Sequence, residues 1–174
     1  MVFHDNTLLI YHIYLIESNI DYLSMPESEF TDDVKTIEWW NSQPKHLRDA
    51  AFNGDESIYA AMERLILWVI EQRSTSPTNS LNVWGNAPCV DCALITYCFD
   101  HLNFASPWAY WEEKDVRTVY DLCTQIHNVD WRRTLTRPGT HHKAIDDAKF
   151  ELIYLQKSLQ TLANGKICYG NLSN

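Results

Sequence analysis

Three side chains in this sequence are of types that together could hold a divalent cation and activate a water. Asp91 follows a short apolar run over residues 81–84, and ligands of open α/β sheets gather beyond the carboxyl ends of strands. His142 precedes a predicted helix over residues 144–163, and Asp147 lies in its first turns. A carboxylate on a helix suits a metal ligand, whereas an imidazole on a loop suits a general base.

Each of these positions also has a purely structural explanation. An aspartate that opens a helix is commonly a cap, which accounts for Asp91 equally well. Asp146 and Asp147 lie near a helix N-terminus, where the helix dipole favours negative charge. We expect Asp146 to face the solvent and Asp147 to point inward, beside the apolar stripe of its helix. The residues alone leave both interpretations open.

The apolar periodicity predicts an α/β chain with few strands for its length. The 174 residues are enough for one domain with a proper core, which we expect to span residues 1–174. Strands are expected over residues 8–16 and 81–84, the latter followed by a tight turn, and a polar linker over 74–80. Helices are expected over residues 44–52, 58–73, 91–101, 115–127 and 144–163.

The chain is acidic, with a formal net charge of −9 and a pI near 5.1. A protein that holds nucleic acid by charge neutralisation alone is usually basic. An acidic chain must therefore reach phosphates through bound cations or through a local basic patch. One such patch precedes and includes the start of the 142–148 segment; its members are Arg132, Arg133, Arg137 and Lys143. A solvated charged loop explains the same residues equally well.

Five cysteines and no run of transmembrane length favour a cytoplasmic protein that makes no membrane contact. Cys89 and Cys92 form a CxxC, which is typical of a redox pair or half a zinc site, yet no second half occurs at zinc spacing. Two small, half-buried residues before a helix are the favoured interpretation. A redox or metal protein built on this pair is the weakest of the alternatives.

Four segments, in order, resemble motifs of one enzyme family. Residues 142–148 (HKAIDDA) resemble the third motif of DnaQ-like 3′–5′ exonucleases of the histidine-containing, four-carboxylate type, within the ribonuclease H-like superfamily. Residues 83–86 (VWGN), followed by Asp91, are similar to the second motif. Residues 39–43 (WWNSQ) and 115–118 (DVRT) resemble the branch that contains phage exonuclease A and mycobacterial ribonuclease AS. The resemblance covers roughly residues 2–163; each motif alone is weak, and four in order are a strong signal.

The resemblance implies a ribonuclease H-like mixed sheet flanked by helices, and hydrolysis at the 3′ ends of single-stranded DNA or RNA. It implies two divalent cations, Mg²⁺ or Mn²⁺, which clamp the attacking and leaving oxygens. Asp91 and Asp147 correspond to metal ligands, and His142 corresponds to the general base. Residues expected to contact substrate are Trp84 and Asn86, at the nucleotide pocket, and Arg132, Arg133 and Lys143, at the phosphates.

The sequence departs from the family in its first motif, an Asp-x-Glu that occurs nowhere in the 174 residues. We expect the chain to begin near the end of the family's second strand, whose last residues correspond to residues 2–3, with residues 8–16 as the third strand. Two carboxylates alone are too few to hold a metal pair against water, so little hydrolysis is expected from this form. The alternative is a nucleic-acid- or protein-binding derivative without catalysis. An exposed sheet edge would favour a homo-oligomer, and no motif distinguishes DNA from RNA.

Overall fold

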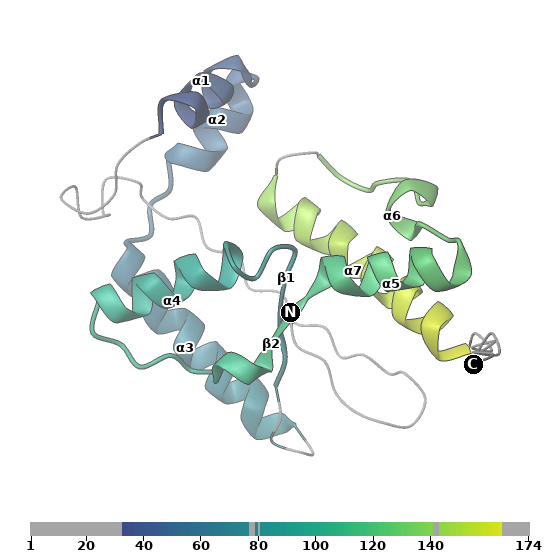
Figure 1. Ribbon diagram of the computed structural model, residues 1–174. Helices are drawn as coiled ribbons and strands as arrows, with labels where there is room; N and C mark the ends of the chain where they lie inside the picture. Colours follow the sequence, from purple (N-terminus) through teal and green to yellow (C-terminus); the bar gives the residue numbers. More distant parts are fainter. Residues whose placement is uncertain (1–32, 77–78, 80, 141–142, 165–174) are drawn as a thin grey trace.

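The computed structural model describes residues 33–76, 79, 81–140 and 143–164, which form a mostly helical α/β structure around a small sheet (Figure 1). The elements in chain order are α1 (Val34–Ser42), α2 (Lys45–Phe52), α3 (Ile58–Thr75), β1 (Val83–Gly85), α4 (Asp91–His101), the 3₁₀ helix η2 (Tyr110–Glu112), β2 (Glu113–Asp115), α5 (Val116–His127), α6 (Trp131–Thr134) and α7 (Ala144–Asn164). None of the helices in these ranges combines the length and apolar content needed to cross a bilayer.

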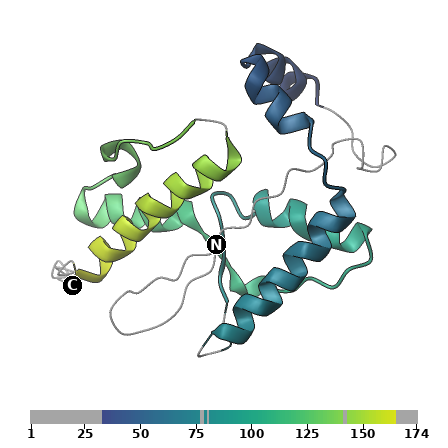
Figure 2. The ribbon, with the colours of Figure 1, turned by 180° about the vertical axis from the view of Figure 1, so that it is seen from behind.

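The two strands pair in parallel and separate the helices into two groups. Val83 pairs with Glu113, and Gly85 pairs with Asp115. Each strand leads toward a helix, α4 after β1 and α5 after β2. Helices α3 and α4 lie on one side of the sheet, and α5, α6 and α7 lie on the other, as Figures 1 and 2 show. Parallel pairing therefore brings the N-terminal ends of α4 and α5 to the same edge.

Each group of helices has its own apolar core, and neighbouring residues of β1 contribute to both. The core around α3 and α4 buries Phe99 completely, and Val83 packs against it. The core between α5 and α7 buries Val116 and Leu155 completely, and Trp84 packs against that one. This alternation is the side-chain period of a strand whose two faces are both covered. The indole of Trp84 is thus a packing group of the second core.

An ion pair joins the end of α3 to the segment that leads into β2. The Arg73 guanidinium donates two hydrogen bonds to the Glu112 carboxylate, each 2.8 Å long, and a third of 3.1 Å to the Pro107 carbonyl. The backbone N–H of Ala109 donates to the same carboxylate at 2.8 Å. The hydrogen bonds from Arg73 lower the pKa of Glu112 below its ordinary value. This partly buried fork fixes the approach of β2 to β1.

Most of the predicted helices are confirmed, with small shifts at their ends. The helix expected over residues 58–73 runs to Thr75, so the expected linker begins later. The helix expected over residues 91–101 has those bounds. The strand expected over 81–84 is wrong by two residues at its start, because Leu81 is buried in the first core without pairing.

Four short elements of the described chain, among them the 3₁₀ helix η2, escape sequence reasoning. The strand β2 consists of Glu113, Lys114 and Asp115, none of them β-branched or aromatic, so only its pairing with β1 identifies it. The helices α1 and α6 were likewise not predicted. The strand expected over residues 8–16 lies outside the described residues, so the mixed, ribonuclease H-like sheet stays a prediction.

We predict that Glu112→Gln lowers the free energy of unfolding by about 1–3 kcal/mol at pH 7, because Arg73 loses its charged partner in a partly buried place. A carboxylate with a lowered pKa stabilises the fold above its ordinary pKa, and this stability is lost as the pH falls through the lowered value. The deficit should therefore shrink below pH 4.5. Urea denaturation at several pH values measures it, and an equal deficit at every pH would contradict this account.

Candidate functional site

Asp91 is fixed against the end of β1 by a tight turn. Its Oδ2 accepts a 3.0 Å hydrogen bond from the backbone N–H of Ala87. A Cβ added to the buried Gly85 would lie 3.2 Å from Asp91 Oδ2 and 3.1 Å from the Cα of Pro88. Only a glycine leaves this space open, so residue 85 allows the carboxylate to sit close to the strand end. One oxygen of Asp91 thus braces the turn before α4 and does not cap the helix, because the N-cap position is Val90 and makes no side-chain hydrogen bond.

Asp147 is paired with an arginine from the preceding loop. Its side chain is 32% exposed, and its Oδ1 forms an ion pair with a guanidinium nitrogen of Arg137. The same guanidinium lies over the ring of Phe150, 5.1 Å from the ring centroid. The Arg137 charge is therefore held on α7 and offsets the charge of Asp147.

A second aspartate of α7 holds the loop that carries Arg137. Asp146 was expected to face the solvent, but it is only partly exposed and its Oδ2 accepts a 2.9 Å hydrogen bond from the backbone N–H of Thr140. Gly139 has φ +74°, and a Cβ there would lie 2.5 Å from the Asp146 Cγ. The expectation for Asp146 is corrected: the carboxylate closes a turn that only a glycine fits without strain.

Glu151 is the acidic residue of this region that sequence reasoning missed. It is half-buried on α7, one helical turn after Asp147. Burial raises the pKa of Glu151, and repulsion from Asp91 raises it further, whereas a hydrogen bond from Asn86 and the charges of Arg137 and Arg117 lower it. The signal was available: Glu151 directly precedes Leu152 in the apolar stripe, so a charged residue borders the buried face.

These contacts connect the two predicted metal ligands through a chain of charges. Asp91 acts on Glu151, Arg137 also acts on Glu151, and Arg137 pairs with Asp147. Within the described residues, however, no group of three or more His, Cys, Asp or Glu side chains is arranged to hold a metal ion. The structure thus relates Asp91 to Asp147 through Glu151 and Arg137, and a metal site shared by the two aspartates stays a prediction.

Asn86 joins the same region from the turn after β1. Its side chain is half-buried and hydrogen-bonds to Glu151. Its Oδ1 is fully buried and has no hydrogen-bond partner among the described residues. A buried carbonyl oxygen without a donor costs free energy unless a proton donor or a cation reaches it.

The basic residues of the 132–143 segment have different surroundings in the structure. Arg132 lies over the ring of Tyr120, 4.6 Å from its centroid, and donates a 3.1 Å hydrogen bond to its hydroxyl. Arg133 has 80% of its side chain exposed and pairs with Asp130 at 3.4 Å. Lys143 is exposed at the start of α7. The general base expected at His142 lies outside the described residues.

The CxxC pair lacks the arrangement of a redox or zinc site. Cys89 is exposed, whereas Cys92 is buried in the first turn of α4. Burial raises the pKa of the Cys92 thiol to about 11, with smaller contributions from Glu113 and Asp91. A thiol of that pKa is scarcely ionised at neutral pH and is therefore a poor nucleophile.

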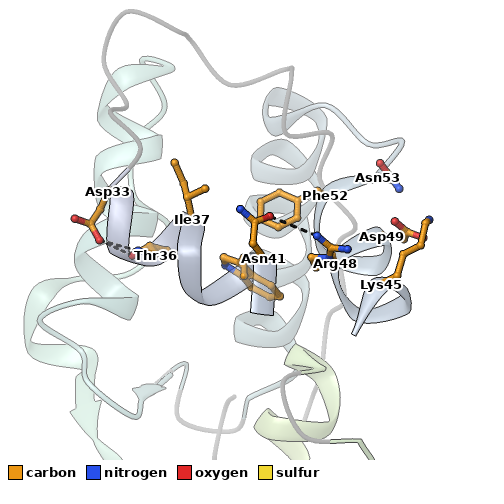
Figure 3. A pocket seen from close by; sticks show the side chains of 10 residues that line it. Asp33, Thr36, Ile37, Asn41, Lys45, Arg48, Asp49, Phe52 and Asn53 are labelled. Atoms are coloured by element: carbon orange, nitrogen blue, oxygen red, sulfur yellow. Dashed lines mark hydrogen bonds and ion pairs between the residues drawn. The ribbon is translucent and has the colours of Figure 1, made fainter. Parts of the chain in front are cut away.

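A separate cavity lies between α1 and α2, away from Asp91 and α7. Figure 3 shows that the apolar side chains of Ile37 and Phe52 and several charged side chains line it together, and its volume is about 630 Å³. Trp40 and Phe52 meet there edge to face, with ring centroids 5.2 Å apart. The lining residues are Asp33, Thr36, Ile37, Trp40, Asn41, Lys45, Arg48, Asp49, Phe52 and Asn53.

A family comparison identifies the class of protein to which this arrangement belongs. The model of the 3′–5′ exoribonuclease Rv2179c-like domain matches residues 16–159. This chain belongs to that family. No curated protein and no solved structure matches it. Membership confirms the resemblance to 3′–5′ exonucleases and indicates an exoribonuclease-like function with a nucleic-acid substrate, while the DnaQ-like branch and the phage relationship stay predictions.

We predict that Glu151→Gln raises the melting temperature by about 2–4 °C at pH 7 without divalent cations, equivalent to about 1 kcal/mol for a domain of this size. The substitution removes a half-buried charge beside Asp91 while an amide keeps the shape. A carboxyl with a raised pKa destabilises the fold as the pH rises from its ordinary value of 4.5 through the raised value. The gain should therefore fade toward pH 4.

Thermal melts followed by circular dichroism at pH 4 to 8 measure this effect. Glu63→Gln, on the exposed face of α3, is the matched control and should leave the melting temperature unchanged. A Glu151→Gln protein that melts lower than the wild type at pH 7 would show that the carboxylate is a net stabilising partner.

Proposed function

We propose that this domain removes nucleotides from the 3′ ends of single-stranded RNA by hydrolysis that depends on divalent cations. Membership of the exoribonuclease family over residues 16–159 is the observation that carries the proposal. The position of Asp91 at the end of β1, connected through Glu151 and Arg137 to Asp147, supports it. A homo-oligomeric state and a cytoplasmic location stay predictions.

In this proposal Asp91 and Asp147 hold Mg²⁺ or Mn²⁺, and the oxygen ligands of this region suit such hard cations. When bound, the cation offsets the negative charge that develops on the phosphate and assists ionisation of water. In this scheme His142 would take the proton of the water that attacks the phosphorus of the terminal nucleotide, while the bond from that phosphorus to the 3′ oxygen of the preceding nucleotide breaks. The departing 3′ oxygen would take a proton from the solvent, and His142 would release its own proton to the solvent. Asp147, on the rigid helix α7, keeps its position throughout.

Arg137 has two roles in this scheme. Without substrate it offsets the charge of Asp147, and a phosphate group is the other anion that a guanidinium binds with two parallel hydrogen bonds. Transfer of Arg137 from Asp147 to the substrate phosphate would leave the carboxylate free for a cation. Because the sequence contains no Asp-x-Glu, we propose that the 174-residue form hydrolyses RNA slowly.

We predict that Asp91→Asn and Asp147→Asn each lower Mn²⁺-dependent shortening of a 5′-labelled single-stranded RNA by about 100-fold or more, since each removes a charged ligand. Denaturing gels over time, with and without a chelator, provide the rates. Asp100→Asn, at the exposed far end of α4, is the control and should keep the wild-type rate. Equal rates in all four proteins would disprove the assigned roles.

A second candidate is an RNA-binding derivative without catalysis. The Arg137–Asp147 ion pair favours it, because the Arg137 guanidinium already neutralises the carboxylate that was predicted to bind a metal. We predict that Arg133→Glu then weakens RNA binding several-fold and lowers its salt dependence, because the side chain is 80% exposed. Arg132 packs on Tyr120, so its reversal would disturb the core as well. Filter binding between 50 and 200 mM salt, with no shortening of bound RNA, would select this candidate.

A further inference from the structure

Positive charge is unevenly distributed along this acidic chain. Residues 116–164, which contain α5, α6 and α7, carry seven Lys and Arg against five Asp and Glu, a net charge of +2. Residues 33–115 carry six against twelve, a net charge of −6. Figure 1 places α5, α6 and α7 together on one side of the sheet, so the net positive charge belongs to that side. A polyanion should therefore approach the chain over these three helices.

A groove of about 420 Å³ lies on this side, where the end of α7 meets α5 and α6. It is separate from the predicted catalytic residues, because Lys157 follows Asp147 on α7 by ten residues, about 15 Å further along the helix axis. The lining residues are His127, Trp131, Lys157, Gln160, Thr161 and Asn164.

Trp131 gives this groove an aromatic surface of fixed orientation. Its ring packs partly against the core between α5 and α7, and its Nε1 donates a 2.9 Å hydrogen bond to Thr161 Oγ1. The Thr161 hydroxyl in turn donates a 2.8 Å hydrogen bond to the Lys157 carbonyl. An indole that is already held in place loses little conformational entropy when a flat ring stacks on it.

Lys157 gives the groove a cation that is available to an anionic ligand. Its side chain is exposed, and within the described residues it forms no ion pair with a carboxylate. Its Nζ lies 5.9 Å from the centroid of the Trp131 ring, at the outer limit of a cation–π contact. The ammonium can therefore move from the ring to a phosphate oxygen at little cost, which exposes the ring.

His127 and Gln160 add polar groups that suit a sugar-phosphate chain. His127 Nε2 is buried and has no hydrogen-bond partner in the part of the chain that the structure describes. A polar nitrogen of this kind costs free energy unless a polar group reaches it. The imidazole and the amide can each donate and accept hydrogen bonds, as contact with hydroxyl and phosphate oxygens requires.

We propose that this groove binds an unpaired nucleotide of single-stranded RNA, several nucleotides before the 3′ end that is hydrolysed. The base stacks on Trp131, and Lys157 moves to a neighbouring phosphate. The inference rests on the RNA substrate of the proposed function and adds a contact remote from Asp91 and Asp147. Aromatic surfaces beside cations hold single strands with little regard to sequence, so the groove would retain the strand while its end is shortened.

Binding of a labelled single-stranded RNA of about sixteen nucleotides to the full chain tests the phosphate contact, with a chelator present to prevent hydrolysis. Lys157→Gln should weaken binding about threefold to tenfold and reduce the slope of log affinity against log salt by about 0.7, because one phosphate contact is lost. Lys35→Gln, at an exposed position of α1, is the matched control and should keep both values. Wild-type affinity and slope in Lys157→Gln would overturn the inference.

Tryptophan fluorescence tests the stacking contact. A base stacked on Trp131 quenches its emission, so the decrease that the RNA causes in the wild type should be largely lost in Trp131→Phe. Trp111→Phe, at a ring that is 66% exposed in η2, is the control and should keep the decrease. Circular dichroism verifies the fold of Trp131→Phe, and Lys157→Gln, with its exposed side chain, provides a test that does not disturb the core. Undiminished quenching in folded Trp131→Phe would contradict stacking at this ring.

The outcomes separate this inference from the proposed function. RNA binding that is indifferent to Lys157 and Trp131, together with Mn²⁺-dependent shortening by the wild type, would overturn the groove and leave the exoribonuclease proposal intact. RNA binding that requires both residues, without shortening in Mn²⁺, would support the groove and overturn the hydrolysis. A wild-type chain that binds no RNA would overturn both.

Discussion

The parallel pairing of β1 with β2 is the constraint on which the rest of the structure depends. Only three residues of each strand take part, with Gly85 opposite Asp115. So short a pairing needs contacts outside the sheet to hold the two strands together. Val83 and Trp84 insert into the two cores on opposite faces, and the Arg73–Glu112 ion pair fixes the approach of β2. Because the strands are parallel, α4 and α5 start at one edge, and α7, packed on α5, brings its acidic face there.

Charge at this edge follows from the geometry. Burial raises the pKa of Glu151 on α7 and repulsion from Asp91 raises it further, although Asp91 itself is exposed to solvent. Arg137 neutralises Asp147 through an ion pair, and its attraction lowers the pKa of Glu151 less than burial raises it.

The helices of this domain and its family relationship could be predicted from sequence, because both depend on local patterns. The apolar stripe of α7 and the turn before Asp91 are each defined by residues a few positions apart. The motifs at residues 83–91 and 142–148 led to the exonuclease family, and the match over residues 16–159 confirms it at the level of a 3′–5′ exoribonuclease domain. The strand β2 could not be predicted, because Glu113 and Lys114 acquire their conformation from a partner thirty residues away in sequence.

The sequence by itself determined the positions of α4 and α7 and the family, because helix periodicity and motif spacing are properties of neighbouring residues. The assignment of Asp91 and Asp147 as cation ligands stays a prediction from the same motifs. Only the tertiary structure decided which side chains meet. It placed Trp84 in a core, Arg137 on Asp147, and Glu151 beside Asn86 and Asp91. The contacts of Trp84 and Glu151 join segments far apart in the sequence, and they depend on the packing of α7 against α5 beside a parallel sheet, a relation that no local pattern encodes.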